Sequence, residues 1–256
     1  MSDVRVFGPG GYRFIPGVFQ YSGGVAAQPG YRIVRVRLSR PVPLVEGFRL
    51  IESTLRSGGR PLAAFCACEL RSPAPFTEAG FRTFNELYAG QLKDWGIYDG
   101  SVNPVARSNV CPVIHPPREP SLYAFSFTER HAGDSCTFVV AGSAEAPEGK
   151  PNYRDFIVRR GEISPAALRE KARFVLDAAM GARLSALGFG WAHTSATQVY
   201  TVHDLHPFLA EEIVSRGAAD SGLTWHYCRP PVVDLEYEMD CRGVALERTI
   251  NVDATS

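Results

Sequence analysis

A lone arginine at the start of an apolar segment is the residue of this sequence best placed to do chemistry. Arg107 follows Pro104, Val105 and Ala106 and precedes the apolar stretch 110–114. A guanidinium group stays charged in proteins, and burying it without a partner is costly. The segment therefore predicts that Arg107 pairs with an anion, either a protein carboxylate or a ligand carboxylate held by two parallel hydrogen bonds.

Candidate acids lie near the end of the chain. Glu236 and Glu238 alternate with apolar residues over 235–239, a period-two pattern that predicts a strand with both acids on one face. Such a face is either solvated or turned towards Arg107 across a domain boundary, where desolvation would change the proton affinity of an acid. We expect any catalytic acid at these two positions, and Glu145 is the next candidate.

Two other groups of residues could bind a ligand. The aromatic cluster Trp225, His226 and Tyr227 serves equally well as buried packing or as a stacking platform for a planar substrate. Histidine and aspartate side chains between 193 and 226 are of the types that bind zinc or iron. However, His203 and His206 fall in a predicted turn, where polar residues are expected, so no metal site is predicted.

Two amphipathic helices must position these residues. In the first half, Leu44, Phe48, Ile51 and Leu55 recur at helical spacing. The second helix is expected to begin with Ser164 as its N-cap and Pro165 at its first position, and to end at Gly188. Its apolar face has six members: Leu168, Ala172, Val175, Ala179, Leu184 and Leu187.

The same order of elements occurs twice along the chain. After each helix come glycines, an apolar strand (62–70 or 194–202) and a Pro-Phe pair. The pairs at Pro75-Phe76 and Pro207-Phe208 are 132 residues apart, about half of the 256-residue chain. Two domains are also what this length suggests, and the Pro-rich segment 115–117 marks their junction. We therefore predict one domain over 1–119 and a second over 120–256.

The composition argues against a nucleic-acid-binding, membrane-spanning or secreted protein. Lys+Arg and Asp+Glu are equal at 27 each, which argues against binding to nucleic acid or to a membrane surface. No apolar run approaches the roughly 20 residues of a membrane span, and the N-terminus lacks the apolar core of a signal peptide. None of the six cysteines forms a Cys-x-x-Cys pair, so reduced thiols and a cytoplasmic location are expected.

Several of these segments resemble the Rid family of small trimeric proteins that hydrolyse reactive enamines and imines. The resemblance rests on Phe84-Asn85 in a helix, on Val-Ala-Arg-Ser at 105–108, and on strands at 136–145, 194–202 and 233–239. It implies an α+β fold of two tandem Rid-like domains, also called chorismate-mutase-like. Each domain would have a mixed sheet of five or six strands with two helices packed on one face. Domain 1 would be degenerate but would carry Arg107.

The resemblance also implies a function. Arg107 would bind a substrate carboxylate, with Asn85 and Ser143 as further binding residues, and a cofactor-independent hydrolytic deamination of an enamine or imine would follow. Substrates of the 2-aminoacrylate or 2-aminomuconate type both fit, and a homotrimer is expected. Neither half carries both the arginine and the acid of the family, so a composite site between domains is one possibility and loss of activity another. A chorismatase-like enzyme acting on a cyclic dicarboxylate and a non-catalytic small-acid-binding protein remain alternatives.

Overall fold

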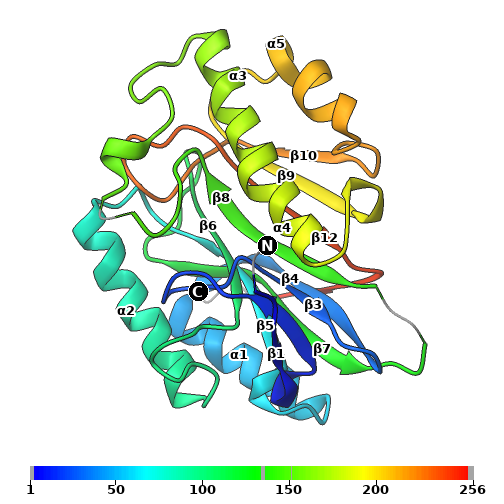
Figure 1. Ribbon diagram of the computed structural model, residues 1–256. Helices are drawn as coiled ribbons and strands as arrows, with labels where there is room; N and C mark the ends of the chain where they lie inside the picture. The colour runs from blue at the N-terminus through cyan, green and yellow to red at the C-terminus, as the bar shows by residue number, and fades with distance from the viewer. Residues whose placement is uncertain (1–2, 134–135, 151, 253–256) are drawn as a thin grey trace.

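The computed structural model of the protein describes residues 3–133, 136–150 and 152–252, and its strands form two mixed sheets (Figure 1). In the first sheet only β9 and β10 run parallel. Its order is β1 (Arg5–Phe7), β2 (Tyr12–Ile15), β3 (Gly24–Ala27), β8 (Phe138–Ala144), β12 (Glu238–Gly243), β9 (Ala196–Tyr200) and β10 (Leu223–His226).

The second sheet has six strands and two parallel pairs, β5 with β6 and β4 with β13. Its order is β11 (Cys228–Arg229), β6 (Ala106–Pro112), β5 (Phe65–Arg71), β7 (Ser121–Arg130), β4 (Tyr31–Pro43) and β13 (Leu246–Ile250). The prediction of mixed sheets with few helices is thus confirmed, with seven and six strands rather than five or six each.

Each of the two sheets is covered by its own helices. Helices α1 (Leu44–Ser57) and α2 (Glu78–Asp94) pack on the six-stranded sheet, and their apolar side chains share a core with its strands. The seven-stranded sheet carries a longer helical segment and a shorter one. The longer runs through α3 (Pro165–Phe174), a π-helical stretch (Val175–Gly181) and α4 (Ala182–Ala186); the shorter runs through α5 (His206–Phe208), a π-helical stretch (Leu209–Ile213) and a 3-10 turn (Val214–Arg216). Four further 3-10 turns lie at Gly8–Gly10, Leu62–Ala64, Arg154–Phe156 and Trp191–His193.

Both predicted helices form from the residues that predicted them. Phe48, Ile51 and Leu55 are buried in α1. The second helix begins at Ser164, whose side chain accepts a hydrogen bond from the backbone N–H of Ala167, and all six residues of its predicted apolar face are buried. Gly188 follows its last turn with a φ of 82°, a conformation that favours glycine.

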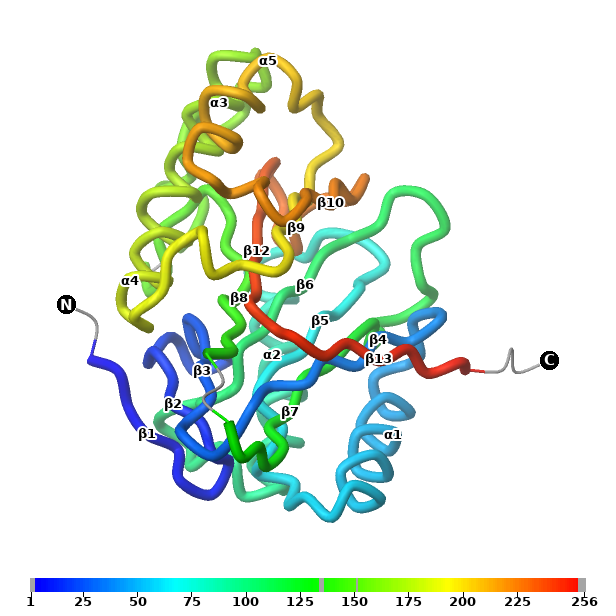
Figure 2. The backbone as a smooth tube through the Cα atoms, turned by 90° about the vertical axis from the view of Figure 1, so that its right-hand side faces the viewer, coloured from blue at the N-terminus to red at the C-terminus, as the bar shows by residue number. Residues whose placement is uncertain are grey.

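The predicted boundary at residues 119 and 120 does not separate the two sheets. Strand β7 lies after that boundary but pairs with β4 and β5 of the first half. Strand β3 lies before it but pairs with β8 of the second half. Figure 2 shows β1 and β13 on opposite sides of the molecule, with β1–β3 beside β8 and β13 beside β4. Each sheet needs strands from both halves because pairing depends on free strand edges rather than on order along the chain.

A third apolar core lies where the two sheets meet. It contains Tyr12, Val25 and Ala141 from the seven-stranded sheet together with Ile33 and Ala106 from the six-stranded sheet. The backbone of Ser22 also pairs with that of Ala106, next to Arg107. This junction brings Arg107 on β6 close to strands β8 and β12.

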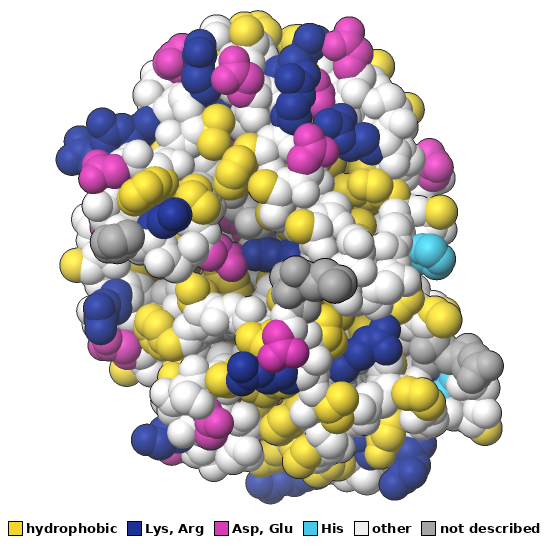
Figure 3. All heavy atoms as spheres, viewed as in Figure 1, with side chains coloured by type: hydrophobic (Ala, Val, Ile, Leu, Met, Phe, Trp, Pro, Cys, Tyr) yellow, Lys and Arg dark blue, Asp and Glu magenta, His cyan; other side chains and the backbone are white. Residues whose placement is uncertain are grey.

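The surface shows no segregation of charge on the face of Figure 3, where basic and acidic side chains are interspersed with apolar ones. This matches the equal numbers of acidic and basic residues. Within the described part of the chain, no helix combines the length and the apolar character that a membrane crossing requires.

Candidate active site

Arg107 is buried in β6 and forms no ion pair with any residue that the structure describes. Its side chain is 3% exposed, and its Nε and Nη1 atoms have no hydrogen-bond partner among the described residues. Aromatic rings surround the guanidinium: its central carbon lies 4.8 Å from the ring centre of Tyr88 and 5.3 Å from that of Tyr21. Phe81 and Phe84 lie at 5.7 and 5.6 Å. Cation–π contacts offset only part of the cost of burial, so this guanidinium is suited to receive an anionic ligand.

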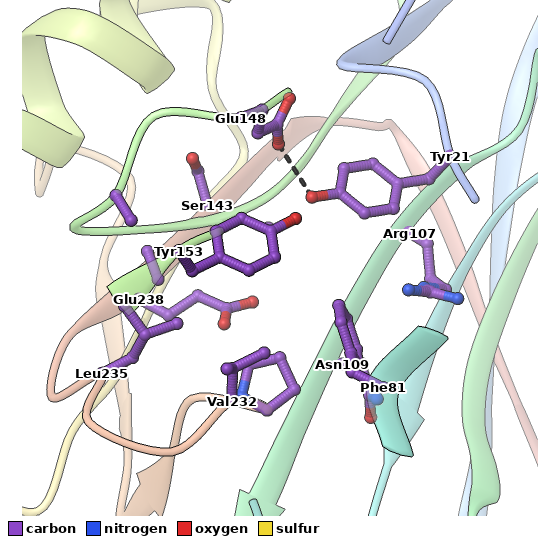
Figure 4. Close-up of a pocket in the computed structure, with 14 residues that line it drawn as sticks. Tyr21, Phe81, Arg107, Asn109, Ser143, Glu148, Tyr153, Val232, Leu235 and Glu238 are labelled. Carbon is purple, nitrogen blue, oxygen red and sulfur yellow. Dashed lines mark hydrogen bonds between the residues drawn. The ribbon is translucent and has the colours of Figure 1, made fainter. Parts of the chain in front are cut away.

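A cavity opens beside Arg107 and contains about 480 Å³ of empty space, part of it open to solvent. Both halves of the chain contribute to its wall (Figure 4). Its lining consists of Tyr21, Phe81, Arg107, Asn109, Gly142, Ser143, Ala144, Ala146, Glu148, Tyr153, Pro231, Val232, Leu235 and Glu238. The predicted residues Arg107, Ser143 and Glu238 therefore line the same cavity, although they lie up to 131 residues apart in the sequence.

Glu238 is the acid that shares this cavity with Arg107. It opens β12, pairs with Ala144 of β8 and Tyr200 of β9, and is 3% exposed. Burial raises the pKa of the Glu238 carboxyl well above its usual range; the nearby Asp240 and Glu145 raise it further, whereas Arg107 lowers it. Burial therefore favours the neutral form of the Glu238 carboxyl, the form that can donate a proton.

The close approach of Glu238 to β8 depends on a glycine. A Cβ atom at Gly142 would lie within 2.3 Å of Glu238 Oε1 and 3.1 Å from Cα of Ser108. Any larger residue at position 142 would push the carboxyl group aside. Because Gly142 has no side chain, the Glu238 carboxyl group has room beside β6.

Asn109 adds a second free donor two residues after Arg107 on the same strand. Its Oδ1 accepts a hydrogen bond of 2.9 Å from Ser72 Oγ, and its buried Nδ2 has no partner among the described residues. Arg107 and Asn109 lie on the same face of β6 because side chains alternate along a strand. Together they give this wall of the cavity several unpaired N–H groups, an arrangement that suits carboxylate oxygens.

Tyr21, Glu148 and Arg183 form a connected group beside the cavity. The Tyr21 hydroxyl donates to Glu148 Oε1 at 2.8 Å (the dashed line in Figure 4), and Arg183 Nη2 donates to the same oxygen at 2.7 Å. Burial, and then the Glu148 carboxylate, raise the pKa of Tyr21 well above its usual range, so the phenol keeps its proton.

Glu145, predicted as an alternative catalytic acid, does not line the cavity. Its carboxylate is fully buried and accepts hydrogen bonds from Lys171 Nζ at 3.1 Å and from the backbone N–H groups of Glu236 and Tyr237 at 2.7 and 3.0 Å. These three contacts tie the end of β8 to α3 and to the segment before β12. Glu145 therefore stabilises the segments around the cavity and does not face into it.

The prediction that Glu236 and Glu238 share one face is wrong. Strand β12 begins only at Glu238, because the backbone N–H groups of residues 236 and 237 bind Glu145 instead of a neighbouring strand. Glu236 turns away and binds His203 Nε2 at 2.7 Å and Arg229 Nη1 at 3.0 Å. It does not line the cavity.

The aromatic cluster at 225–227 also lies elsewhere. Trp225 and His226 are on β10, at the edge of the seven-stranded sheet. Trp225 Nε1 donates to the carbonyl of Thr201, His226 stacks on the Tyr200 ring with 5.0 Å between the ring centres, and Tyr227 is 53% exposed. Burial, followed by Arg71, lowers the pKa of His226 to about 4, so it is neutral near pH 7.

Asn85 lies near the cavity without lining it. It is 1% exposed on α2, on the helix face that also carries Phe81 and Phe84, and its Oδ1 has no partner among the described residues.

The histidines and Asp204 do not meet at a metal site: within the described ranges there is no group of three or more His, Cys, Asp or Glu side chains arranged to hold a metal ion.

Sequence reasoning missed several lining residues. Asn109 could have been found, since strand alternation puts it beside Arg107. Tyr21, Glu148 and Tyr153 come from loops whose positions depend on long-range packing, and no local pattern marks them.

Comparisons with known proteins agree with a deaminase. Residues 4–248 match the model of a family described as 2-aminomuconate deaminase CnbZ. The chain is 50% identical over 252 residues to 2-amino-5-chloromuconate deaminase from Comamonas testosteroni, covering 98% of this chain and 100% of the relative. A chorismatase crystal structure aligns with a TM-score of 0.49 and 12% identity, over 87% of this chain and 77% of that one. Membership of the Rid family does not follow from these matches. The chain belongs to the 2-aminomuconate deaminase CnbZ family.

Proposed function

We propose that this protein is a hydrolytic deaminase of 2-aminomuconate-type substrates. The names of the family and of the Comamonas relative support this substrate class. Such a substrate is a dienamine with a carboxylate on the carbon that bears the amino group and a second carboxylate at its far end. The observation that carries the proposal is one cavity lined by both an unpaired buried guanidinium and a buried neutral carboxylic acid.

Arg107 binds the carboxylate beside the amino group. Its unpaired Nε and Nη1 atoms can form two charge-assisted hydrogen bonds to one carboxylate. The Asn109 amide and the Ser143 hydroxyl line the same space and can hold further oxygens of the substrate. The surrounding aromatic rings suit a planar conjugated chain.

Glu238 supplies the proton that starts the reaction. Protonating the dienamine on carbon converts it into an iminium ion, and burial favours the protonated form of the Glu238 carboxyl that this step uses. Water then adds to the carbon that bears nitrogen, ammonia leaves, and a 2-oxo acid remains. The iminium form of the substrate is itself the electrophile, so the proposed reaction requires neither a metal nor an organic cofactor.

The test measures ammonia and the absorbance of 2-aminomuconate with purified protein, before and after treatment with a chelator and desalting. We expect one ammonia per substrate, unaffected by the treatment. Glu238→Gln should lower turnover by about 10²–10⁴-fold and still bind cis,cis-muconate, an unreactive dicarboxylate. Binding of muconate by the parent protein without any ammonia release would instead indicate a small-acid-binding protein, and full activity of Glu238→Gln would place the acid elsewhere.

A further inference from the structure

The proposed hydrolysis needs a second group that accepts a proton from the attacking water. Glu238 cannot fill this role at the start, because it enters the reaction as a neutral acid. Among the described residues that line this cavity, one other carries a carboxyl group, Glu148. We infer that Glu148 is the base that activates water, and that Arg183 and Tyr21 position it. This inference rests on the proposed function.

Glu148 is held in place through one of its two oxygens. Oε1 accepts the hydrogen bonds from the Tyr21 hydroxyl at 2.8 Å and from Arg183 Nη2 at 2.7 Å. Arg183 is itself fixed, since its Nη1 donates to the carbonyl of Ala141 at 3.0 Å and its side chain is only 11% exposed. Oε2 has no hydrogen-bond partner within the described ranges. The carboxylate is therefore oriented while one oxygen remains available to water.

The two acids of the cavity differ in their charged neighbours. Glu148 forms an ion pair with Arg183. Glu238 is 3% exposed, forms no ion pair with any described residue, and its burial favours the neutral carboxyl group. A carboxyl group paired with a cation and a second one buried without a cation, both lining one cavity, are the arrangement that we propose for a base and an acid.

This pairing gives a complete proton balance. Glu238 donates its proton to the substrate carbon and becomes a carboxylate. Water forms a bond to the iminium carbon while Glu148 takes one of its protons, which yields a carbinolamine. Glu148 then returns that proton to the nitrogen as the C–N bond breaks and ammonia leaves. The hydroxyl proton of the former water passes to Glu238 as the carbonyl forms. Both side chains end in their starting states.

The alternative is a purely structural role, in which the pair of Arg183 and Glu148 only ties the loop after β8 to α4. A structural pair would affect folding and ligand binding, whereas a base affects the steps after carbon protonation. The variant Glu148→Gln separates these roles because the amide keeps an oxygen for Tyr21 and Arg183 but cannot take up a proton from water. Glu212→Gln is the matched control: Glu212 pairs with Arg173 and Arg216, is buried and does not line the cavity.

The experiment follows turnover in D₂O with 2-aminomuconate. For Glu148→Gln we expect ammonia release to fall about 10²–10⁴-fold, muconate binding to stay within threefold of the parent, and recovered substrate to carry deuterium on the protonated carbon. Glu238→Gln should lose both deuterium incorporation and ammonia release, and Glu212→Gln should keep both. Parent-like ammonia release by Glu148→Gln would overturn the inference while leaving the proposed function intact. No ammonia release by the parent would instead refute the proposed function.

If Glu148→Gln does not fold, as judged by circular dichroism, Arg183→Gln tests the same claim. The Glu148 carboxylate then loses one of the two donors that orient it. We expect ammonia release to fall, while muconate binding is unchanged and recovered substrate still carries deuterium on the protonated carbon. Ammonia release equal to that of the parent would overturn the inference.

Discussion

Two arginines of this protein, Arg35 and Arg107, are buried to the same 3% exposure and yet differ completely in their partners. Arg35 binds Glu69 through two hydrogen bonds of 2.6 and 2.9 Å and binds Glu247 at 3.0 Å. Burial alone would raise the pKa of Glu69, but Arg35, together with Arg242 and Arg71, outweighs burial and lowers that pKa to about 2. Arg107 has no such acid, although Glu238 lines the same cavity.

The difference shows how to distinguish a structural cation from a binding cation. At Arg35, the protein supplies the counter-charge, and the pair connects β4, β5 and β13. At Arg107, burial favours the neutral form of the nearby Glu238 and aromatic rings occupy the surroundings, so we propose that a ligand supplies the counter-charge. Burial does not separate these roles, whereas hydrogen-bond satisfaction does.

The largest effect is expected from removing the satisfied arginine. Arg35→Met leaves Glu69 and Glu247 without their cation in a largely buried site, so the free energy of unfolding should fall by about 3–5 kcal/mol. Urea denaturation followed by circular dichroism measures this change. A decrease smaller than about 1 kcal/mol would show that the two arginines do not differ in this way.

Arg107→Met should weaken ligand binding without lowering the free energy of unfolding. Losing a charge-assisted bidentate contact should weaken muconate binding by about 1.5–3 kcal/mol, measured by calorimetry. The free energy of unfolding should stay constant or rise, because an unpaired buried charge is removed. An unfolded Arg107→Met variant would mean that Arg107 is structural, like Arg35.

Glu238→Gln should stabilise the protein in a pH-dependent way. The folded-state pKa of Glu238 is raised, so above the unfolded-state pKa of about 4.3 the unfolded chain loses this proton while the folded chain keeps it. The parent therefore loses stability as pH rises from about 4 towards the folded-state pKa, by up to about 1.4 kcal/mol per pH unit. The variant should match the parent near pH 4 and exceed it by a growing margin as the pH rises towards 7. Equal stability of both proteins from pH 4 to pH 7 would show that Glu238 is ionised.

Gly142→Ala should give a moderate loss of stability and a clear change in activity. The new methyl group meets the end of the Glu238 side chain and the backbone of Ser108, and such overpacking costs about 1–3 kcal/mol. Because the proton donor is displaced, we expect kcat to fall about tenfold while muconate binding on Arg107 persists. Comparing kcat with the muconate dissociation constant checks this, and unchanged kcat would separate Gly142 from the position of the acid.

Local sequence patterns predicted the two amphipathic helices and singled out Arg107, but they did not predict which strands pair in the sheets. Helical spacing identified α1 and the α3–α4 segment, because amphipathic periodicity is set by neighbouring residues. The apolar context of Arg107 indicated a guanidinium in need of an anion. The pairing of β3 with β8 and of β7 with β4 depends on long-range contacts. The opposite directions of Glu236 and Glu238 depend on Glu145, 91 residues before Glu236, and alternation alone could not reveal this.

The most direct test of the account is a crystal structure of the protein with cis,cis-muconate. The account predicts one muconate carboxylate on the Arg107 guanidinium through two hydrogen bonds of about 2.7–2.9 Å. The conjugated chain should lie in the cavity between Tyr21 and Glu238. A muconate bound elsewhere, with Arg107 still lacking an anion, would contradict the central claim.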